Sequence, residues 1–470
     1  MQHRNESLDA LRGFAILSMV LSGAIAFGGV LPAWMYHAQV PPPLHKFDAS
    51  IPGITWVDLV FPFFIFSMGA AIPLALKKYI DQGKGFITVA QLAIKRFLLL
   101  AFFALFSQHM KAWVISPSPD YQDQLLSILG FILLFFQFYE YKGDKFKIVF
   151  IALKVFAFII GCLLLSRLPF WNGTGFEKYK SDIIILVLAN MAFFGTVIYF
   201  LTRNQPLLRI GILPIIMAVF LSSKDPASSW TKLVFEWSSV GEIKIDWLYK
   251  FYFLKYLFIL LPGTIAGEWL LESFKNEAKS QVLSYQKYII ISLLILILVG
   301  FNLYALFARE LFLNLVVSLA IIIAILFLIK ELPLSHLYRR LAMAGSYILI
   351  LGLFFEAYEG GIKKDPSTYS YYFVTTSLAF LCIILFEILS RFTFSSKITF
   401  FLALNGKNPM VAYVAGSLFV LPVLSITGLD EVFNSMTQNA WMGFLKGILF
   451  TGLVSLITIL FVKKGWFWKT

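Results

Sequence analysis

The sequence predicts an all-α fold, a polytopic transmembrane helical bundle of about 12–14 helices with both termini in the cytoplasm. Hydrophobic residues make up 59% of the 470 residues and charged residues only 14%, whereas soluble domains are about 45–50% apolar and about 25% charged. The mean hydropathy of the chain is +0.81. Apolar stretches of about 20 residues, each long enough to cross the hydrocarbon core of a bilayer, recur along the whole chain. A water-soluble enzyme is therefore excluded.

The first apolar stretch resembles a signal peptide only superficially. It lacks a small-residue cleavage site and is followed by many more spans, so we expect a retained helix. Asp9 and Arg12 at its start are three residues apart, on one helix face, and we expect them to form a structural ion pair at the cytoplasmic boundary. No soluble domain and no internal repeat interrupts the series, and we expect residues 1–470 to form a single transmembrane domain. The expected spans are 8–31, 54–76, 96–115, 124–141, 146–166, 182–201, 207–222, 250–271, 287–307, 311–330, 341–358, 369–390, 398–424 and 438–462.

The placement of the basic residues predicts the orientation of these spans. Lys and Arg gather in alternate short loops, which places those loops in the cytoplasm. The net charge of +13 therefore indicates a protein of the lipid bilayer and not a nucleic-acid partner. Cys162 and Cys382 each lie in the middle of a span, so we expect neither a disulfide framework nor a metal site. The opposite face carries longer loops rich in aromatic residues and proline, where we expect the chemistry to lie.

The loop before the second span contains the best candidates for acid–base chemistry. His37 and His45 lie in this loop, and Asp58 lies just inside the span that follows. A histidine ahead of a buried aspartate has the parts of a general base with an orienting carboxylate. The alternative interpretation of Asp58 is a helix-start carboxylate stabilised by the helix dipole.

Two further segments contain polar residues at membrane depth or close to it. Asn405 and Asn408 lie where the penultimate predicted span opens, directly before a proline. Buried amides need partners, and a proline frees carbonyl groups that can line a cavity; the alternative is an ordinary proline-kinked helix start. The outer-loop run 360–372, with Lys364 and Tyr369, suits a sugar or an anion, or equally an interfacial belt of lysine and tyrosine.

Five segments together resemble the heparan-α-glucosaminide N-acetyltransferase family and its bacterial relatives. They are R-x-x-S-L-D-A-L-R-G at 4–13, T-W-V-D-L-V-F-P-F-F-I-F-x-M-G at 55–69, I-K-K and Y-S-Y within 362–371, G-K-N-P-M-V-A-Y-V at 406–414 and K-K-G-W-F-W-K at 463–469. The second segment is the most specific of the five. The segments follow one another in the family's order over almost the whole chain.

The resemblance implies a transmembrane N- or O-acetyltransferase. Acetyl-CoA from the cytosol would be the co-substrate, and an amino sugar or another saccharide on the far, periplasmic side would accept the acetyl group. Carried over residue by residue, the family's catalytic histidine falls on His45 and its motif carboxylate on Asp58. The family's asparagine and outer-loop lysine fall on Asn408 and Lys364.

This sequence departs from the family in three respects. The interval after His45 is a few residues longer than usual, which leaves His37 as a rival for the catalytic role. The stretch 280–345 holds about two additional helices, and no large lumenal domain precedes the first span. We therefore expect a bacterial branch located in the inner membrane, and the resemblance is compatible with a homodimer.

The sequence thus predicts a membrane acyltransferase that uses acetyl-CoA and no metal, with a loop histidine as general base. Asn408, Lys364, Asn405 and Tyr369 are the candidate substrate-binding residues. The nucleotide phosphates are expected near basic residues of the cytoplasmic side, namely Arg96, Arg209, Arg340 or Lys397. The alternative function is a transporter or flippase of a sugar or a lipid-linked saccharide, whose pathway the polar groups would line.

Overall fold

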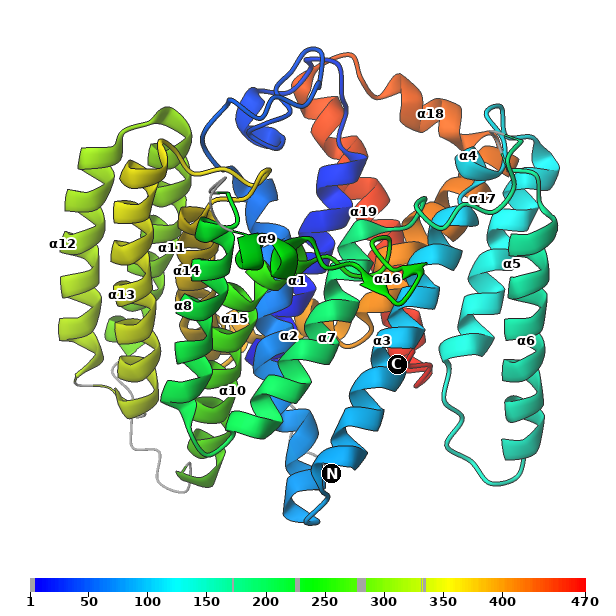
Figure 1. Ribbon diagram of the computed structural model, residues 1–470. Helices are drawn as coiled ribbons and strands as arrows, with labels where there is room; N and C mark the ends of the chain where they lie inside the picture. Colours follow the sequence, from blue (N-terminus) through cyan, green and yellow to red (C-terminus); the bar gives the residue numbers. More distant parts are fainter. Residues whose placement is uncertain (1–4, 171–172, 225–228, 277–284, 331, 333–334) are drawn as a thin grey trace. The chain divides into compact units, whose positions relative to one another are not determined.

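A computed structural model describes residues 5–470 except 171–172, 225–228, 277–284, 331 and 333–334 (Figure 1). Most of the described part is helical, and 13 of its helices are long and apolar enough to cross a membrane. The helix over Pro206–Ser222 is also apolar but shorter. The predicted all-α, multi-pass helical bundle is confirmed, and the chain is a membrane protein. Arg4, the first residue of the family-like segment, lies outside the described residues.

The chain, predicted as one domain over 1–470, gathers into two compact units that alternate along the sequence. The first unit contains Met1–Gly83, Tyr256–Gly406 and Thr437–Gly447. The second unit contains Lys84–Lys255, Lys407–Met436 and Ile448–Thr470.

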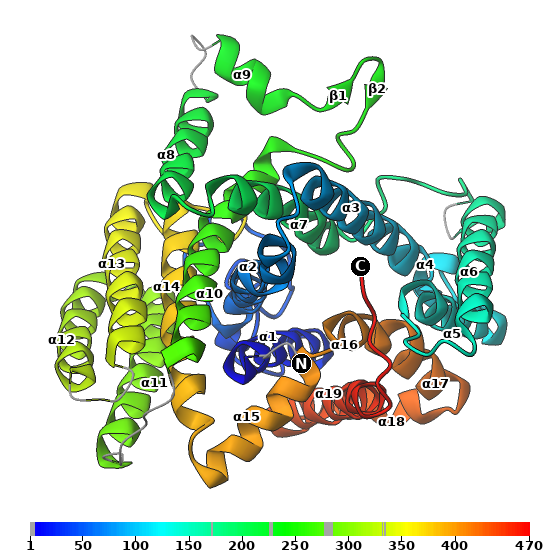
Figure 2. The same cartoon turned by 90° about the horizontal axis from the view of Figure 1, so that it is seen from below.

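In the first unit, long helices pack around one buried helix, α14 (Tyr369–Leu389). Its elements are α1 (Glu6–Ala24), the 3₁₀ turn η1 (Ala33–Met35), α2 (Trp56–Asp81), α10 (Leu257–Asn276), α11 (Tyr285–Ala308), α12 (Leu311–Ile329), α13 (Ser335–Glu359), α14 (Tyr369–Leu389), α15 (Thr393–Gly406) and the first part of α19 (Ala440–Lys463). Nearly every side chain of α14 is buried, and α13 runs beside it (Figure 2).

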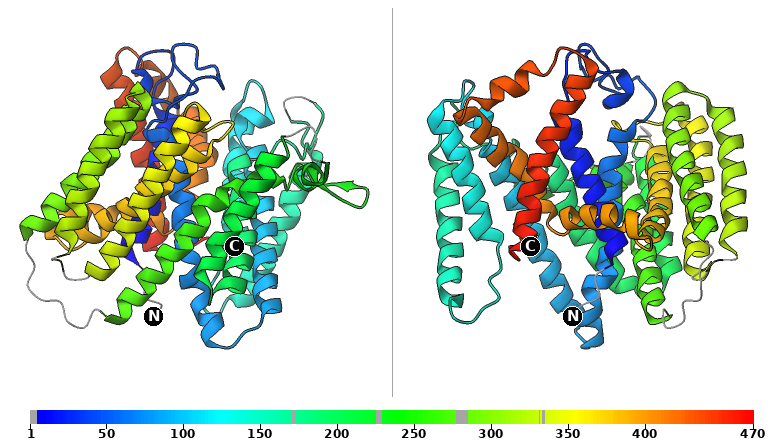
Figure 3. Two further views of the ribbon diagram at one scale, coloured as in Figure 1. Left: turned by 60° about the vertical axis from the view of Figure 1, so that its left-hand side comes forward. Right: turned by 180° about the vertical axis from the view of Figure 1, so that it is seen from behind.

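Two glycines allow α15 to cross α1 at very short range (Figure 3). A Cβ atom on Gly13 would come within 1.8 Å of the Leu402 carbonyl oxygen, and one on Gly406 within 1.9 Å of the Asp9 carbonyl oxygen. Small residues are the usual means by which membrane helices bring their backbones together. Both glycines belong to family-like segments. Those two segments are therefore neighbours in space although about 390 residues separate them in the chain.

A predicted ion pair near the start of the chain also links helices of the first unit. Arg12 contacts the Asp9 carboxylate at 3.3 Å, one helical turn away, as the sequence suggested. The second nitrogen of the same guanidinium donates to the backbone carbonyl of Ser67 in α2 at 3.2 Å. The pair therefore fixes α1 against α2 as well as neutralising two charges.

The second unit contains the remaining elements. They are α3 (Phe86–His109), α4 (Ala112–Ile115), α5 (Tyr121–Phe138), α6 (Lys147–Arg167), α7 (Ile183–Thr202), α8 (Pro206–Ser222), α9 (Ser229–Glu236), the two-residue strands β1 (Ser239–Val240) and β2 (Ile243–Lys244), η2 (Phe251–Tyr256), α16 (Pro409–Ala415), the π-helical turn η3 (Gly416–Val420), α17 (Leu421–Ile426), α18 (Leu429–Ser435) and the rest of α19. The helices α5 and α6 form an antiparallel pair (Figure 1), and β1 and β2 form a small antiparallel hairpin.

Three predicted boundaries are corrected by the structure. The expected span 398–424 is not one helix, because α15 ends at Gly406 and α16 begins at Pro409. Proline has no backbone N–H to continue a helix but suits the first helical position. The helix α3 begins at Phe86 and α13 at Ser335, so Arg96 and Arg340 lie within helices and not in loops.

Candidate functional site: a histidine held by a buried carboxylate

Asp58 is the centre of the site, and its two carboxylate oxygens have different tasks. Thr55 is the N-cap of α2, and its backbone N–H donates to Asp58 Oδ2 at 2.9 Å, which completes a capping box. This arrangement satisfies backbone groups that a helix start leaves without partners. The other oxygen, Oδ1, lies 2.7 Å from Nδ1 of His37. The two interpretations of Asp58 drawn from the sequence are therefore both present in one side chain.

His37 is the histidine that Asp58 orients. The Asp58 side chain is 2% exposed, whereas the His37 side chain is 37% exposed. Because Nδ1 faces a carboxylate, we assign the proton of the neutral ring to Nδ1, which donates to Asp58 and leaves Nε2 as an acceptor. A buried carboxylate thus holds an imidazole that ligands can reach.

Lys364 completes the group from the loop between α13 and α14. Its Nζ lies 3.2 Å from both ring nitrogens of His37. Loss of solvent around the ammonium group lowers the pKa of Lys364 from its ordinary 10.5, and the negative charges of Asp58 and then Asp365 offset part of this effect. A lysine of this kind exchanges its proton more readily than a surface lysine.

Gln39 joins the two loops that carry His37 and Lys364. The Gln39 side-chain amide donates to the Asp365 carbonyl, and the Asp365 N–H donates to Gln39 Oε1 at 2.8 Å. Gln39 is only 4% exposed, so water competes little for these two hydrogen bonds. The contact fixes a residue two positions after His37 against the neighbour of Lys364.

Further hydrogen bonds hold the loop that carries Lys364. Glu359 accepts from the backbone N–H groups of Tyr369 and Ser370 at 2.8 and 2.9 Å, at the start of α14. The Tyr371 hydroxyl donates to the Asp58 carbonyl at 2.9 Å, which ties α14 to α2. The loops that carry His37 and Lys364 are therefore anchored to two helix starts, which favours a fixed geometry.

His45 does not contact Asp58 in this way. Its Nε2 accepts from the Gly28 N–H at 3.0 Å, and its ring meets the edges of Tyr36 and Phe27, with centroids 4.5 and 5.0 Å away. The expected pairing of His45 with Asp58 is therefore corrected, because the chain turns so that His37 faces the carboxylate. His37, the alternative candidate from the sequence, occupies the position beside the Asp58 carboxylate.

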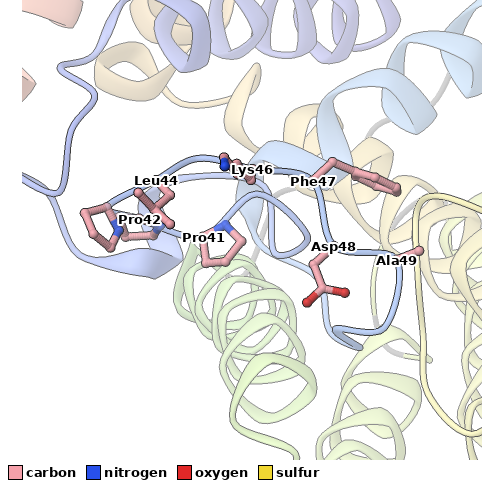
Figure 4. A pocket seen from close by; sticks show the side chains of 8 residues that line it. Pro41, Pro42, Leu44, Lys46, Phe47, Asp48 and Ala49 are labelled. Atoms are coloured by element: carbon pink, nitrogen blue, oxygen red, sulfur yellow. The ribbon is translucent and has the colours of Figure 1, made fainter.

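An open hollow lies along the same loop, after His37. Its volume is about 540 Å³, and residues 41–44 and 46–49 line it. Figure 4 shows Lys46, Phe47 and Asp48 among the lining side chains. Hydrogen bonds from the Ser50 side chain and backbone lower the pKa of the Asp48 carboxyl, so this carboxylate stays charged at neutral pH. The volume lies in the range of ordinary small-molecule sites.

The other candidate substrate-binding residues take different positions. Asn408 is committed to the C-terminal segment, because its Nδ2 donates to the Trp466 carbonyl at 2.9 Å and its Oδ1 accepts from the Trp468 N–H at 3.2 Å. Asn405 donates to the Phe401 carbonyl of its own helix at 3.0 Å. The Tyr369 ring packs in a cluster of phenylalanines. The described contacts of Asn408 make it a structural residue of the second unit.

The four candidate phosphate-binding residues are divided between the units. Arg96 and Arg209 belong to the second unit, Arg340 and Lys397 to the first. Arg209 is fully buried and bonds the side chain and backbone of Thr202, each at 3.2 Å. These bonds join α7 to α8, and the role of Arg209 in phosphate binding stays a prediction. Arg340 pairs with Glu272 at 2.6 Å on the surface, and Lys397 is exposed.

The second unit contains another polar cluster around a carboxylate, and this carboxylate, Asp182, is buried. Asp182 caps α7 through bonds from the backbone N–H groups of residues 184 and 185, and its Oδ2 accepts from the Tyr413 hydroxyl at 2.6 Å. Burial lowers the pKa of the neighbouring Lys111, and the charge of Asp182 offsets part of that change. Asp182 and Tyr413 hold structure together here, whereas the cluster around His37 has an exposed imidazole.

Sequence reasoning missed Gln39, Asp365 and the role of Tyr371. Gln39 and Asp365 are 326 residues apart, so no local spacing could have paired them. The one available signal was that the polar residue Gln39 lies in the histidine loop itself, two positions after His37.

One comparison with known protein families gives a match. A family model described as a domain of unknown function (DUF5009) matches residues 4–270, which is more than half of the chain. The matched range includes His37, Gln39 and Asp58 but not Lys364. None of the curated proteins matches the chain.

Proposed function

Since this chain belongs to the DUF5009 family, whose function is unknown, we propose a function from the site: a membrane-embedded acyltransferase of the bacterial inner membrane. It transfers an acetyl group from cytosolic acetyl-CoA to an amino sugar or another saccharide on the periplasmic side. The observation that carries this proposal is the 2.7 Å contact between the exposed imidazole of His37 and the buried carboxylate of Asp58. The resemblance to the heparan-α-glucosaminide N-acetyltransferase family suggests the donor and the class of acceptor.

His37 acts as the general base. As the acceptor amine or hydroxyl attacks the thioester carbonyl carbon, its proton moves to Nε2 of His37. The carbon–sulfur bond breaks, and the coenzyme A thiolate leaves and takes up a proton. Asp58 keeps the proton of the resting ring on Nδ1 and stabilises the imidazolium that forms. Base catalysis of this kind contributes about 10²–10⁴-fold to a rate.

Lys364 supplies the positive charge of the reaction. Its Nζ lies beside both ring nitrogens, so it reaches the same space as an acceptor bound at Nε2. In its protonated form it donates to the carbonyl oxygen of the thioester, where negative charge develops in the transition state.

The hollow along residues 41–49 is suited to the acceptor. A saccharide can stack on the exposed Phe47 ring and donate hydroxyl groups to Asp48, and both residues line the hollow. The hollow belongs to the same loop as His37. The acceptor would therefore be held on the outer face, while the acyl group arrives from the cytoplasmic face.

The test is transfer of radiolabelled acetyl from acetyl-CoA to a panel of amino sugars by the purified protein in detergent. We expect labelled product from the wild type and a loss of about 10²–10⁴-fold in His37→Gln. A titration with acetyl-CoA accompanies the assay. If the wild type neither forms product nor binds acetyl-CoA, the enzyme proposal fails, and uptake of labelled sugar into vesicles without acetyl-CoA would favour a transporter instead.

A further inference from the structure

A groove lined by aromatic rings lies in the second unit, far along the sequence from the histidine site. Its volume is about 580 Å³, and its lining includes Phe131, Phe135, Phe150, Phe461 and Trp466. The phenylalanines come from α5, the start of α6 and the end of α19, all three of which are candidate membrane spans, and Trp466 comes from the segment just after α19. The groove is almost entirely apolar, so it suits a hydrocarbon chain better than a nucleotide or a sugar.

Hydrogen bonds and ring contacts hold the wall of the groove at Trp466 in place. Gly465 adopts a φ of 72°, which ends α19, and the Trp466 N–H donates to the Phe461 carbonyl at 2.8 Å. The Asn408 amide then holds the carbonyl of Trp466 and the N–H of Trp468. The Trp466 ring meets Phe135 and Phe461 with centroids 5.5 and 5.4 Å away. A shape held in this way is pre-organised to receive a ligand.

Exposed lysines are frequent in the chain segments next to these helix ends. The chain segments that flank the groove, 139–147 and 463–469, contain six exposed lysines and two acidic residues: Lys142, Lys145, Lys147, Lys463, Lys464 and Lys469, with Glu140 and Asp144. A hydrogen bond from Lys469 lowers the pKa of Glu140, and the charges of Lys469, Lys154 and Lys95 add to this effect. The mouth of the groove is therefore positive.

We propose that this groove binds one acyl chain of an anionic phospholipid whose phosphate group lies among these lysines. An apolar, aromatic channel takes a hydrocarbon chain, and the surplus of exposed lysines selects the negative headgroup. Lysines near a membrane surface each contribute to the binding of anionic lipids. This site is separate from the histidine site, and the inference does not depend on the proposed acetyl transfer.

The experiment uses phosphatidylglycerol with a photoactivatable group on one acyl chain, and the matching phosphatidylcholine, each added to the full-length protein in detergent. Crosslinked peptides are located by mass spectrometry. We expect phosphatidylglycerol to label the peptides around Phe135 and Leu460 about tenfold more than phosphatidylcholine does. Lys463→Gln with Lys464→Gln should remove most of this preference, because two charges are lost from the mouth.

A second variant tests the groove itself. Leu460→Trp fills the lining, whereas Leu456→Trp adds the same bulk to an exposed position one turn away that does not line the groove. We expect loss of labelling in Leu460→Trp alone. Equal labelling by both lipids in the wild type, or unchanged labelling in Leu460→Trp, overturns the proposal. Displacement of the lipid by added acetyl-CoA also overturns it, because the groove would then belong to the co-substrate. If Leu460→Trp fails to fold, the lysine variant decides the question.

Discussion

His37 and His45 are eight positions apart in one loop, yet their surroundings differ completely. His37 faces a buried carboxylate on one side and a lysine ammonium on the other. His45 lies between two aromatic rings and uses Nε2 to accept from a backbone N–H. The first environment orients a ring and prepares it to take up a proton. The second environment offers it no charged partner among the described contacts.

The difference shows that the role of a loop histidine is decided by what reaches it from distant parts of the chain. Asp58 is presented by a helix cap, and Lys364 by a loop more than 300 residues away. The position of His45 is fixed by contacts within its own segment, to Gly28 and Phe27. We therefore assign the chemistry to His37 and a structural role to His45.

The largest effect is expected in His37→Gln. Glutamine can still donate to Asp58, so the loop should keep its path, but it cannot accept the acceptor's proton. We expect acetyl transfer to fall by about 10²–10⁴-fold, measured as labelled product in the assay above. His45→Gln is the matched control, with an expected change of less than about threefold. A large loss in His45→Gln with none in His37→Gln would reverse the comparison.

Asp58→Asn should have the next largest effect. Asparagine can still accept from the Thr55 N–H at the start of α2, but it no longer stabilises a positive charge on His37. We expect a loss of about 10²-fold in acetyl transfer and a change in the free energy of unfolding of less than about 1 kcal/mol. Thermal unfolding in detergent gives the second value, and a large loss of stability would show that Asp58 is mainly a helix cap.

Gln39→Leu should act through position and not through chemistry. It removes the two hydrogen bonds to the Asp365 backbone, and the net loss of one such bond costs about 0.5–1.5 kcal/mol. We expect a lower midpoint of thermal unfolding and slower acetyl transfer. The dependence of the transfer rate on acetyl-CoA concentration is measured for Gln39→Leu and for Gln39→Glu. This comparison separates an effect on position from an effect on chemistry. A variant with wild-type stability and rate would show that the two loops need no such contact.

The smallest expected effect is a pH dependence of stability from Lys364. Its pKa in the folded protein is lowered from the ordinary 10.5, so below that pH the unfolded chain binds more protons than the folded chain. Stability from this group therefore increases as the pH rises toward 10.5. As the pH rises over this range, we expect the unfolding midpoint of the wild type to increase relative to that of Lys364→Met. Lys363→Met, compared at the same pH values, controls for loss of a lysine, and an unchanged difference would contradict the burial of the ammonium group.

Much of the fold could be predicted because it depends on local patterns. Span length and hydropathy indicated the helices, and the three-residue spacing of Asp9 and Arg12 suggested their ion pair. The helix break before Pro409 was missed, and the residues on both sides of it were placed in one long span, because apolar residues continue on both sides. The close crossing of α1 and α15 depends on Gly13 meeting Gly406, which no local pattern reveals.

The candidate site could be predicted only in part. The residue types were identified from the loop and from Asp58, and the resemblance suggested Lys364. The choice between the two histidines was not determined, because both precede Asp58 in an irregular loop. The path of that loop depends on long-range bonds such as the one between Gln39 and Asp365, and these exist only in the folded chain.

The most direct test of the central claim is histidine footprinting with diethyl pyrocarbonate, which acylates neutral imidazole nitrogens, with and without acetyl-CoA. Peptide mass spectrometry reports the modification of each histidine separately, and no knowledge of the acceptor is needed. We predict that acetyl-CoA protects His37 and leaves the modification of His45 unchanged. Protection of His45 alone, or of neither histidine while acetyl-CoA is bound, would contradict the assignment of the chemistry to His37.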